Sequence, residues 1–225
     1  MIVMEEEHRL DCTKLIADFL EVCIHQILYL RRVYPAEIFE RRQRFGVPIR
    51  MAKHDGVRTY IEELTKSIQT WFKKNTLQEV VLVIFRQPTS SGVPEPIQVL
   101  ERFVFDFHLK GDLSVPIEDT EKLGNLFRGI YLKLTTRSDT ALLQIPSSCN
   151  WTLLLHTDDY NSDQHGEDLR HKEWQKWVPE DKRNMMIDKP VILPMGDPLH
   201  TQAFSMGLFV QECPHEQKPV LDLSQ

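Results

Sequence analysis

The segment TKLIADFLEVCIHQILYLRRVY, Thr13 to Tyr34, is the longest unbroken helical pattern in the sequence. Its apolar residues recur at intervals of three and four, which places them along one face of a helix: Ile16, Leu20, Cys23, Ile27, Leu30 and Tyr34. Only a narrow polar stripe remains: Lys14, Asp18, Glu21, His25 and Arg32. A helix this apolar must be covered by the rest of the chain. We expect Pro35 to end it, because the residue before a proline is pushed out of the α region.

Beyond this segment the spacing of the apolar residues alternates between that of a helix and that of a strand. Two further helices and four strands are predicted: residues 57–73 and 117–134, and residues 79–85, 97–109, 150–156 and 203–212. Asp55 and Asn75 are candidate caps of the second helix. The β-branched run at 79–85 is typical of a strand covered on both faces. The alternating strand at 97–109 is expected to be half-buried and to pair with it through a long loop, Pro88 to Pro96.

This order of elements predicts an α+β fold, in which helices pack on one side of an antiparallel sheet. We expect a single domain over residues 10–212 and a C-terminal extension over 213–225. The polar, irregular part that begins at His156 is too long for an ordinary loop. Such segments inside a compact domain are usually functional or disordered, and its tryptophans and apolar PVILP patch favour a functional one.

Composition narrows the classes of function. The chain has 225 residues and a formal net charge of −6, which argues against binding nucleic acid through bulk electrostatics. One short basic run, Arg41, Arg42 and Arg44, follows Glu37 and Glu40. We interpret it as a solvated helix end or loop rather than a phosphate site. The residues from Ala36 to Gly56 are expected to form a connector with a turn at Phe45–Pro48.

The four cysteines are far apart and show no CxxC spacing, which fits a reduced intracellular compartment. The N-terminal MIVMEEEHRLD lacks the apolar core of a secretory signal. No apolar run approaches the ~20 residues that a membrane-spanning helix needs.

Signatures of catalysis are weak. The sequence has no glycine-rich phosphate loop and no GxSxG nucleophile elbow. A metal-dependent hydrolase centred on His156, His165 and His171 stays open as an alternative, although the spacing is unusual for metal ligands. His25 is interpreted as a hydrogen-bonded structural histidine. We therefore predict no enzyme, no cofactor and no catalytic or metal-ligating residues.

A binding function remains, and aromatic residues in polar surroundings are its candidates. These are Tyr60, Trp174, Trp177 and Phe209. Tyrosine and tryptophan bury a large area with few rotatable bonds, so they often anchor protein interfaces. Tyr60 and Phe209 could equally be core residues, whereas Trp177 lies in the irregular segment and favours an interface.

Several segments together carry a family resemblance. The longest is FLEVCIHQILYLRRVYPAEIFERRQRFGVPIRM, Phe19 to Met51. Others follow in the same order through the chain: TYIEELTKSI, EVVLVIF, ERFVFDF, LFRGIYLKL, WTLLLHT, WVPEDKR, PVILP and LFVQE. In these segments the chain resembles the HORMA-domain family. Within that family it is most similar to the mitotic-arrest-deficient-2-like accessory subunits of DNA polymerase zeta.

The resemblance implies a three-stranded antiparallel sheet backed by three helices, with a C-terminal "safety belt" over about 156–212. In such proteins the belt closes over an extended peptide of a partner, which is held beside a strand by backbone hydrogen bonds. For this chain the implied partner is a peptide of the polymerase zeta catalytic subunit. The residues implied to bind this peptide are Tyr60, Leu64 and Trp177.

A second implied surface binds the C-terminal domain of the Y-family deoxycytidyl transferase, through Ile192, Gly207 and Phe209. Familiar animal members have glutamine and tyrosine in place of Gly207 and Phe209, so two hydrogen-bonding groups are missing here. Arg128 matches a position used for dimerisation between HORMA domains.

These implications predict a non-catalytic, nuclear and cytoplasmic adaptor that bridges two translesion polymerases and is remodelled by an AAA+ ATPase. No membrane association and no direct nucleic-acid binding are expected. The alternative within binding proteins is a spindle-checkpoint or meiotic HORMA adaptor that clamps a peptide of a mitotic regulator.

Overall fold

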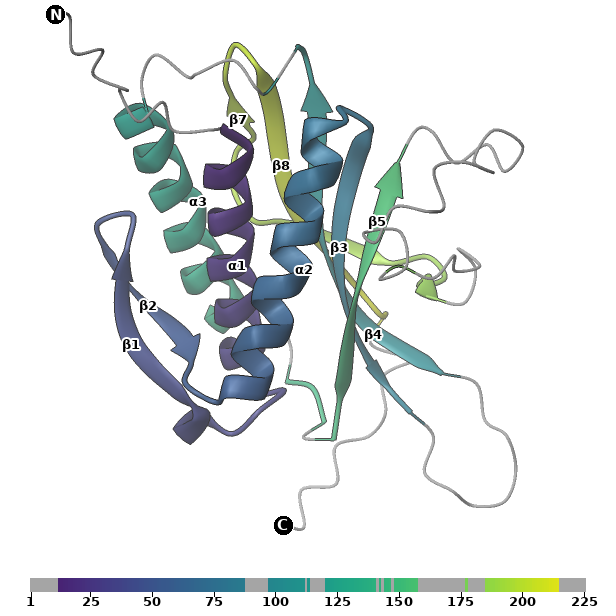
Figure 1. Cartoon of the computed structure of the whole chain (residues 1–225). Helices are drawn as coiled ribbons and strands as arrows, with labels where there is room; N and C mark the ends of the chain where they lie inside the picture. The colour runs from purple at the N-terminus through teal and green to yellow at the C-terminus, as the bar shows by residue number, and fades with distance from the viewer. Residues whose placement is uncertain are drawn as a thin grey trace, which may run out of the picture.

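Three helices pack on one face of a twisted antiparallel sheet, and a separate two-stranded hairpin lies beside them (Figure 1). The computed structural model describes residues 12–87, 97–111, 113, 120–140, 142, 144–146, 148–157, 177 and 185–214. The helices are α1 (Cys12–Leu30), α2 (Asp55–Lys73) and α3 (Thr120–Thr140). The strands are β1 (Phe39–Arg44), β2 (Val47–Ala52), β3 (Leu77–Arg86), β4 (Gln98–Leu109), β5 (Asn150–Thr157), β6 (Val191–Pro194), β7 (Leu199–His200) and β8 (Phe204–Glu212). The predicted α+β class is confirmed.

Helix α1 is the centre of the domain, as its apolar pattern predicts. It ends earlier than predicted, however, because Arg32 adopts a left-handed backbone conformation (φ 52°) five residues after Ile27 and well before the proline. The N–H of Val33 donates to the carbonyl of Leu28, and the N–H of Arg32 donates to that of Tyr29. These two bonds form a Schellman motif, which satisfies the last carbonyls of a helix. The helix therefore stops at Leu30.

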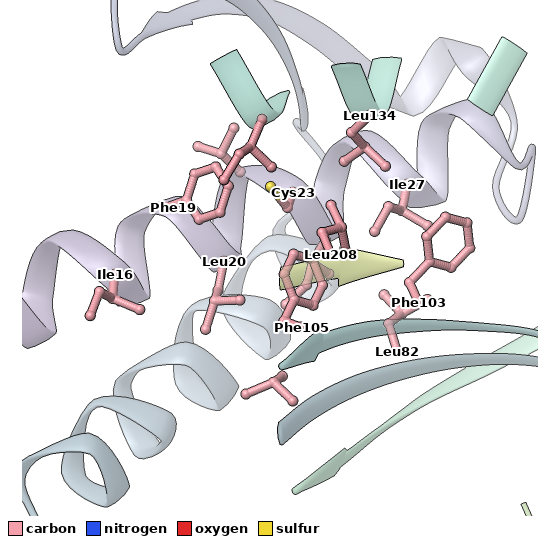
Figure 2. Close-up of a cluster of buried hydrophobic side chains, with 14 of the residues drawn as sticks. Ile16, Phe19, Leu20, Cys23, Ile27, Leu82, Phe103, Phe105, Leu134 and Leu208 are labelled. Atoms are coloured by element: carbon pink, nitrogen blue, oxygen red, sulfur yellow. The ribbon is translucent and has the colours of Figure 1, made fainter. Parts of the chain in front are cut away.

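The main core lies between α1 and the sheet (Figure 2). Large side chains of α1 point toward apolar residues of the strands, and α3 closes the other side. Phe19 stacks on Phe127 of α3 with ring centroids 4.2 Å apart. Because such pairs add to the free energy of burying their area, this contact ties α3 to α1.

The basic run after α1 is part of a β-hairpin, so its prediction as a helix end or loop was wrong. Strands β1 and β2 are joined by Phe45 and Gly46, which both have positive φ (49° and 71°). Two positive φ values define a type I′ turn, which matches the twist of the paired strands. Phenylalanine rarely adopts this conformation, and here its ring is held against Phe19 and Phe127 with centroids 6.1 and 5.8 Å away.

Strand β3 is a buried inner strand of the sheet and pairs with β4 and β5, as the sequence predicts for β3 and β4. One face of β3 joins the main core. The opposite face joins a second apolar cluster on the side of the sheet away from the helices: Val81, Val83, Phe85, Val99, Val104, Met185, Ile187 and Cys213, with Leu154 and Phe209 at its border. Strand β4 is consequently buried on both faces along most of its length, rather than half-buried.

The C-terminal part extends the sheet beyond the three strands that the resemblance implies. The strand order is β5-β3-β4-β8-β6, and β7 also pairs with β8. Strand β8 lies along β4 from Leu109 to Glu101 in an antiparallel register. The chain thus crosses to the edge of the sheet that is opposite β5.

Of the two predicted caps of α2, Asn75 is observed and Asp55 is not. Asn75 has a left-handed backbone conformation (φ 58°) just after the helix, as expected for a C-terminal cap. Asp55 does not cap the N-terminus, because His54 occupies that position and the Asp55 carboxylate pairs instead with Arg58 at 2.6 Å. Within the described part of the chain, no helix is both long and apolar enough to cross a membrane.

Candidate functional site

Strand β5 is an edge of the main sheet. Among the strands that the structure describes, it pairs with β3 alone. Every second N–H and C=O group of an edge strand points away from its neighbour, so an edge can pair with an additional strand. Seven of the eight β5 residues are at least partly exposed; Leu153 is buried. This edge is where an extended peptide could add to the sheet.

Aromatic side chains gather at the start of this edge. Tyr60, on α2, packs edge-to-face on Trp151, the second residue of β5, with centroids 5.5 Å apart. The indole N–H of Trp151 donates to the hydroxyl of Tyr34 at 3.0 Å. Burial and the neighbouring Tyr34 hydroxyl raise the pKa of Tyr60, so its phenol stays neutral and can donate a hydrogen bond. Tyr60 is 50 % exposed, so it is not a core residue. Tyr60 and the Trp151 ring that supports it form an exposed aromatic platform.

A second aromatic residue, Trp177 from the C-terminal part of the chain, contacts α2 further along that helix. Trp177 is half-buried and packs at the border of the main core. Its indole N–H donates to the hydroxyl of Ser67 at 3.0 Å, and that hydroxyl donates to the carbonyl of Leu64 at 2.9 Å. These two hydrogen bonds connect the Trp177 indole through the Ser67 hydroxyl to the Leu64 carbonyl, and so attach Trp177 to α2. Tyr60, Leu64 and Ser67 follow the spacing i, i+4, i+7, which places them on one side of α2.

The predicted peptide-binding residues therefore share one side of α2, and three more residues support them. Sequence reasoning missed these supports: Tyr34, Ser67 and Trp151. The tryptophan at the start of an otherwise aliphatic strand was a usable signal for Trp151. Nothing in the sequence distinguishes Ser67, because its role depends on a hydrogen bond to a residue 110 positions away.

The three residues of the predicted second surface share the sheet face that points away from the helices. Phe209 and Gly207 alternate along β8 on the side opposite the buried Leu208 and Val210. Ile192 lies opposite Gln211 across the β6–β8 ladder, so it points to the same side. Ile192 is 57 % exposed and Phe209 packs at the border of the second apolar cluster. A Cβ atom at position 207 would meet no atom within 4 Å.

Arg128, the predicted dimerisation residue, lies on α3 next to the tip of the β1–β2 hairpin. Its Nη1 atom is 3.3 Å from the position that a Cβ atom would take at Gly46. The side chain is half-buried, so its guanidinium forms part of a surface made jointly by α3 and the hairpin. Its role in dimerisation stays a prediction.

Two histidines in the described part of the chain, His25 and His156, have structural partners. His25 is fully buried rather than on an exposed stripe, and its Nδ1 accepts a hydrogen bond from the N–H of Ala52 at 3.3 Å. His156 pairs through Nδ1 with the carboxylate of Glu79 on the neighbouring strand. His165, His171 and Trp174 lie outside the described residues. No cluster of three potential metal ligands occurs among the residues that are described.

Comparison with known proteins agrees with this architecture. The family model of the HORMA domain matches residues 12–141. "Mitotic spindle assembly checkpoint protein MAD2B" of Gallus gallus is 28% identical over 202 residues, which cover 89% of this chain and 90% of that protein. "DNA polymerase zeta processivity subunit" of Arabidopsis thaliana is 26% identical over 196 residues, 87% of this chain and 83% of that protein.

A solved structure shares the fold as well. A chain of "Crystal Structure of Mitotic Checkpoint Complex" superimposes with a TM-score of 0.71 at 21% identity, covering 90% of this chain and 98% of that chain. The likeness of fold covers more of the chain than the segment that the family model matches. The chain belongs to the HORMA-domain family.

Proposed function

We propose that this HORMA-domain adaptor holds an extended peptide of the polymerase zeta catalytic subunit against the edge of β5, in the nucleus. The observation that carries the proposal is that β5, which pairs only with β3 among the described strands, lies beside the aromatic pair Tyr60 and Trp151. Backbone pairing with β5 would supply affinity, and the apolar side chains beside it would select the peptide. The similarity to a polymerase zeta processivity subunit supports the choice of partner.

The two aromatic residues are suited to different parts of such a peptide. Tyr60 and Trp151 offer an exposed, rigid apolar face, on which a proline or aliphatic side chain could pack. Trp177, attached to Ser67, would cover the peptide from the side of the belt. The resulting complex would be a peptide between β5 and α2, closed by the segment that contains Trp177.

We expect Trp177→Ala and Tyr60→Ala each to weaken binding of the catalytic-subunit peptide by roughly 1–3 kcal/mol, the usual range for interface anchors. Isothermal titration calorimetry with the synthetic peptide measures this directly. Leu132→Ala, at an exposed apolar residue of α3, is the matched control and should bind as wild type does. If both aromatic variants fold and still bind the peptide with wild-type affinity, the assignment of the pocket is wrong.

The similarity to a spindle-checkpoint protein covers a comparable share of this chain. It supports a second candidate function, an adaptor that clamps a peptide of a mitotic regulator. Both candidates use the same edge and differ only in the peptide. Competition between a polymerase-derived and a checkpoint-derived peptide for wild-type protein distinguishes them. The adaptor role in translesion synthesis requires the polymerase peptide to win.

We further propose that the face with Ile192, Gly207 and Phe209 binds the C-terminal domain of the Y-family transferase. Because Gly207 has open space around it and Phe209 lacks a hydroxyl, this face offers apolar contact but few side-chain hydrogen bonds. The bridge between two polymerases would then depend mainly on apolar area.

Adding the missing polar groups is expected to strengthen this second contact. The double variant Gly207→Gln, Phe209→Tyr should fold normally, since position 207 has room, and should bind the transferase domain about five- to fifty-fold more tightly through one or two new hydrogen bonds. Biolayer interferometry with the immobilised domain measures the gain. An Ile192→Ala variant should lose binding, and unchanged affinity in both variants would place the second partner elsewhere.

A further inference from the structure

The charge of this protein is unevenly distributed. The β1–β2 hairpin, residues 39–52, contains four arginines and one glutamate, which gives it a formal charge of +3 in a chain whose net charge is −6. All four cations are arginines and none is a lysine. The negative net charge of the whole chain therefore does not indicate this basic surface, because the fold places the four arginines together on one hairpin.

Two of these arginines are compensated by nearby carboxylates. Arg42 bonds Glu40 at 2.6 Å. Burial raises the pKa of Asp18 on α1, and the positive charges of Lys14 and Arg44 oppose that rise, so Arg44 lies in the field of an acidic helix face. These two side chains have a structural explanation.

The other two arginines have no such explanation. Arg41 and Arg50 are directly opposite each other in the β1–β2 ladder, so both side chains emerge on the same face of the hairpin. No carboxylate within the described part of the chain forms an ion pair with either of them. Like charges in directly opposite positions destabilise a hairpin, and among the described residues no ion pair offsets this cost.

The position of Arg50 is also restrained. Its guanidinium carbon lies 4.8 Å from the centre of the Tyr29 ring, which itself packs edge-to-face on Phe39 at 5.4 Å. A cation–π contact of this kind holds the planar group in place while it keeps its charge. One arginine of the pair is thus held in position and the other, Arg41, is exposed beside it.

We propose that this face of the hairpin, centred on Arg41 and Arg50, binds the phosphate backbone of single-stranded nucleic acid. Guanidinium groups match phosphate oxygens in pairs, and a single strand carries its charges close enough together for two neighbouring arginines to neutralise neighbouring phosphates. Surfaces that bind single strands use positive side chains that follow the backbone, and arginine adds cation–π contacts with the bases.

The location of the hairpin makes such contact compatible with peptide binding. In Figure 1 the hairpin and the edge strand β5 lie on opposite flanks of the domain, with the helices between them. The contact should be weak, because the rest of the chain carries a formal charge of −9 and repels polyanions. It would serve to orient an adaptor that is already held near DNA by its partners.

Fluorescence anisotropy with a labelled oligothymidine of about 20 nucleotides tests the proposal at salt concentrations from about 20 to 200 mM. Two phosphate contacts predict a slope of roughly −1.4 in log K against log salt. The variant R41Q/R50Q should bind about ten-fold more weakly at the lowest salt and lose most of this slope. R41Q alone should lose about half of it, which guards against misfolding of the double variant.

The control R58Q/K66Q removes the same amount of charge from α2, where both residues lie near Glu62. It should bind the oligonucleotide as wild type does. Equal loss in the control, or unchanged binding by R41Q/R50Q, overturns the proposal. It is also overturned if an acidic peptide of equal charge binds through Arg41 and Arg50 while the oligonucleotide does not, because the face would then belong to an acidic protein partner.

Discussion

Replacing Arg31 by methionine is expected to lower the free energy of unfolding by about 3–5 kcal/mol, the largest effect of any single polar substitution that we anticipate. Arg31 follows α1 directly, and its guanidinium bonds both carboxylate oxygens of Glu101, the fourth residue of β4, with Nε 2.8 Å from Oε2. Glu101 is completely buried and lies opposite Glu212, another buried carboxylate, in the β4–β8 ladder. Without the guanidinium, the buried Glu101 carboxylate would lose both of these hydrogen bonds, and breaking a buried ion pair by removing one partner is strongly destabilising.

Urea unfolding at neutral pH measures this loss, and a double-mutant cycle assigns it. Glu101→Gln should also be strongly destabilising, whereas the double variant Arg31→Met, Glu101→Leu should lose clearly less than the sum of the two single effects. Additive losses would mean that the two side chains do not interact as the geometry indicates. Because Glu101 lies opposite Glu212 in the β4–β8 ladder, loss of the Arg31–Glu101 ion pair should also destabilise the pairing of the C-terminal strands with β4.

Acidification should destabilise the protein through His25, by about 3 kcal/mol between pH 7 and pH 4. Burial, assisted by the charge of Arg42, lowers the pKa of His25 to about 4 in the folded chain. An unfolded histidine has a pKa of about 6.5. Between these values the unfolded chain takes up a proton that the folded chain refuses, so the stabilisation is complete above about pH 6.5 and is lost as pH falls toward 4.

The variant His25→Asn provides the control. An asparagine oxygen can accept the N–H of Ala52 in place of Nδ1, and it does not titrate. Its free energy of unfolding should therefore fall less steeply with decreasing pH, by close to one proton in the linkage slope. Parallel pH profiles for wild type and variant would show that another group controls acid unfolding.

The proposed surfaces lie on different parts of the domain, which bears on how an adaptor works. The β5 edge and the face with Ile192 of β6 lie at opposite ends of the strand order of the main sheet. The hairpin with Arg41 forms a separate two-stranded sheet. No residue is shared between them, so their ligands need not compete for side chains. Arg31 and Glu101 connect the end of α1 to the centre of the sheet between these regions.

Most elements could be predicted from the sequence because their signals are local. The period of α1, the β-branched run of β3 and the left-handed Asn75 depend on neighbours within a few residues. The hairpin formed by β1 and β2 was missed because its strands are short and polar on one side, and its turn contains a phenylalanine where glycine or asparagine is usual. Tertiary packing of that ring overrode the local preference.

The candidate site was only partly predictable for the same reason. Tyr60 and Trp177 could be nominated from their residue types and from family resemblance, but their supports Trp151 and Ser67 act across more than ninety residues of chain. His25 was predicted as structural, yet its complete burial follows from the hairpin that covers it.

By itself, then, the sequence determined the fold class, the helix at the centre of the core and the absence of a recognisable catalytic motif, because periodicity, residue type and motif spacing are written along the chain. The tertiary structure decided which strands form the edges of the described sheet, which aromatic residues support one another and where the arginines of the hairpin gather. These are properties of distance between residues remote in sequence, and they arise only when the sheet and helices have packed.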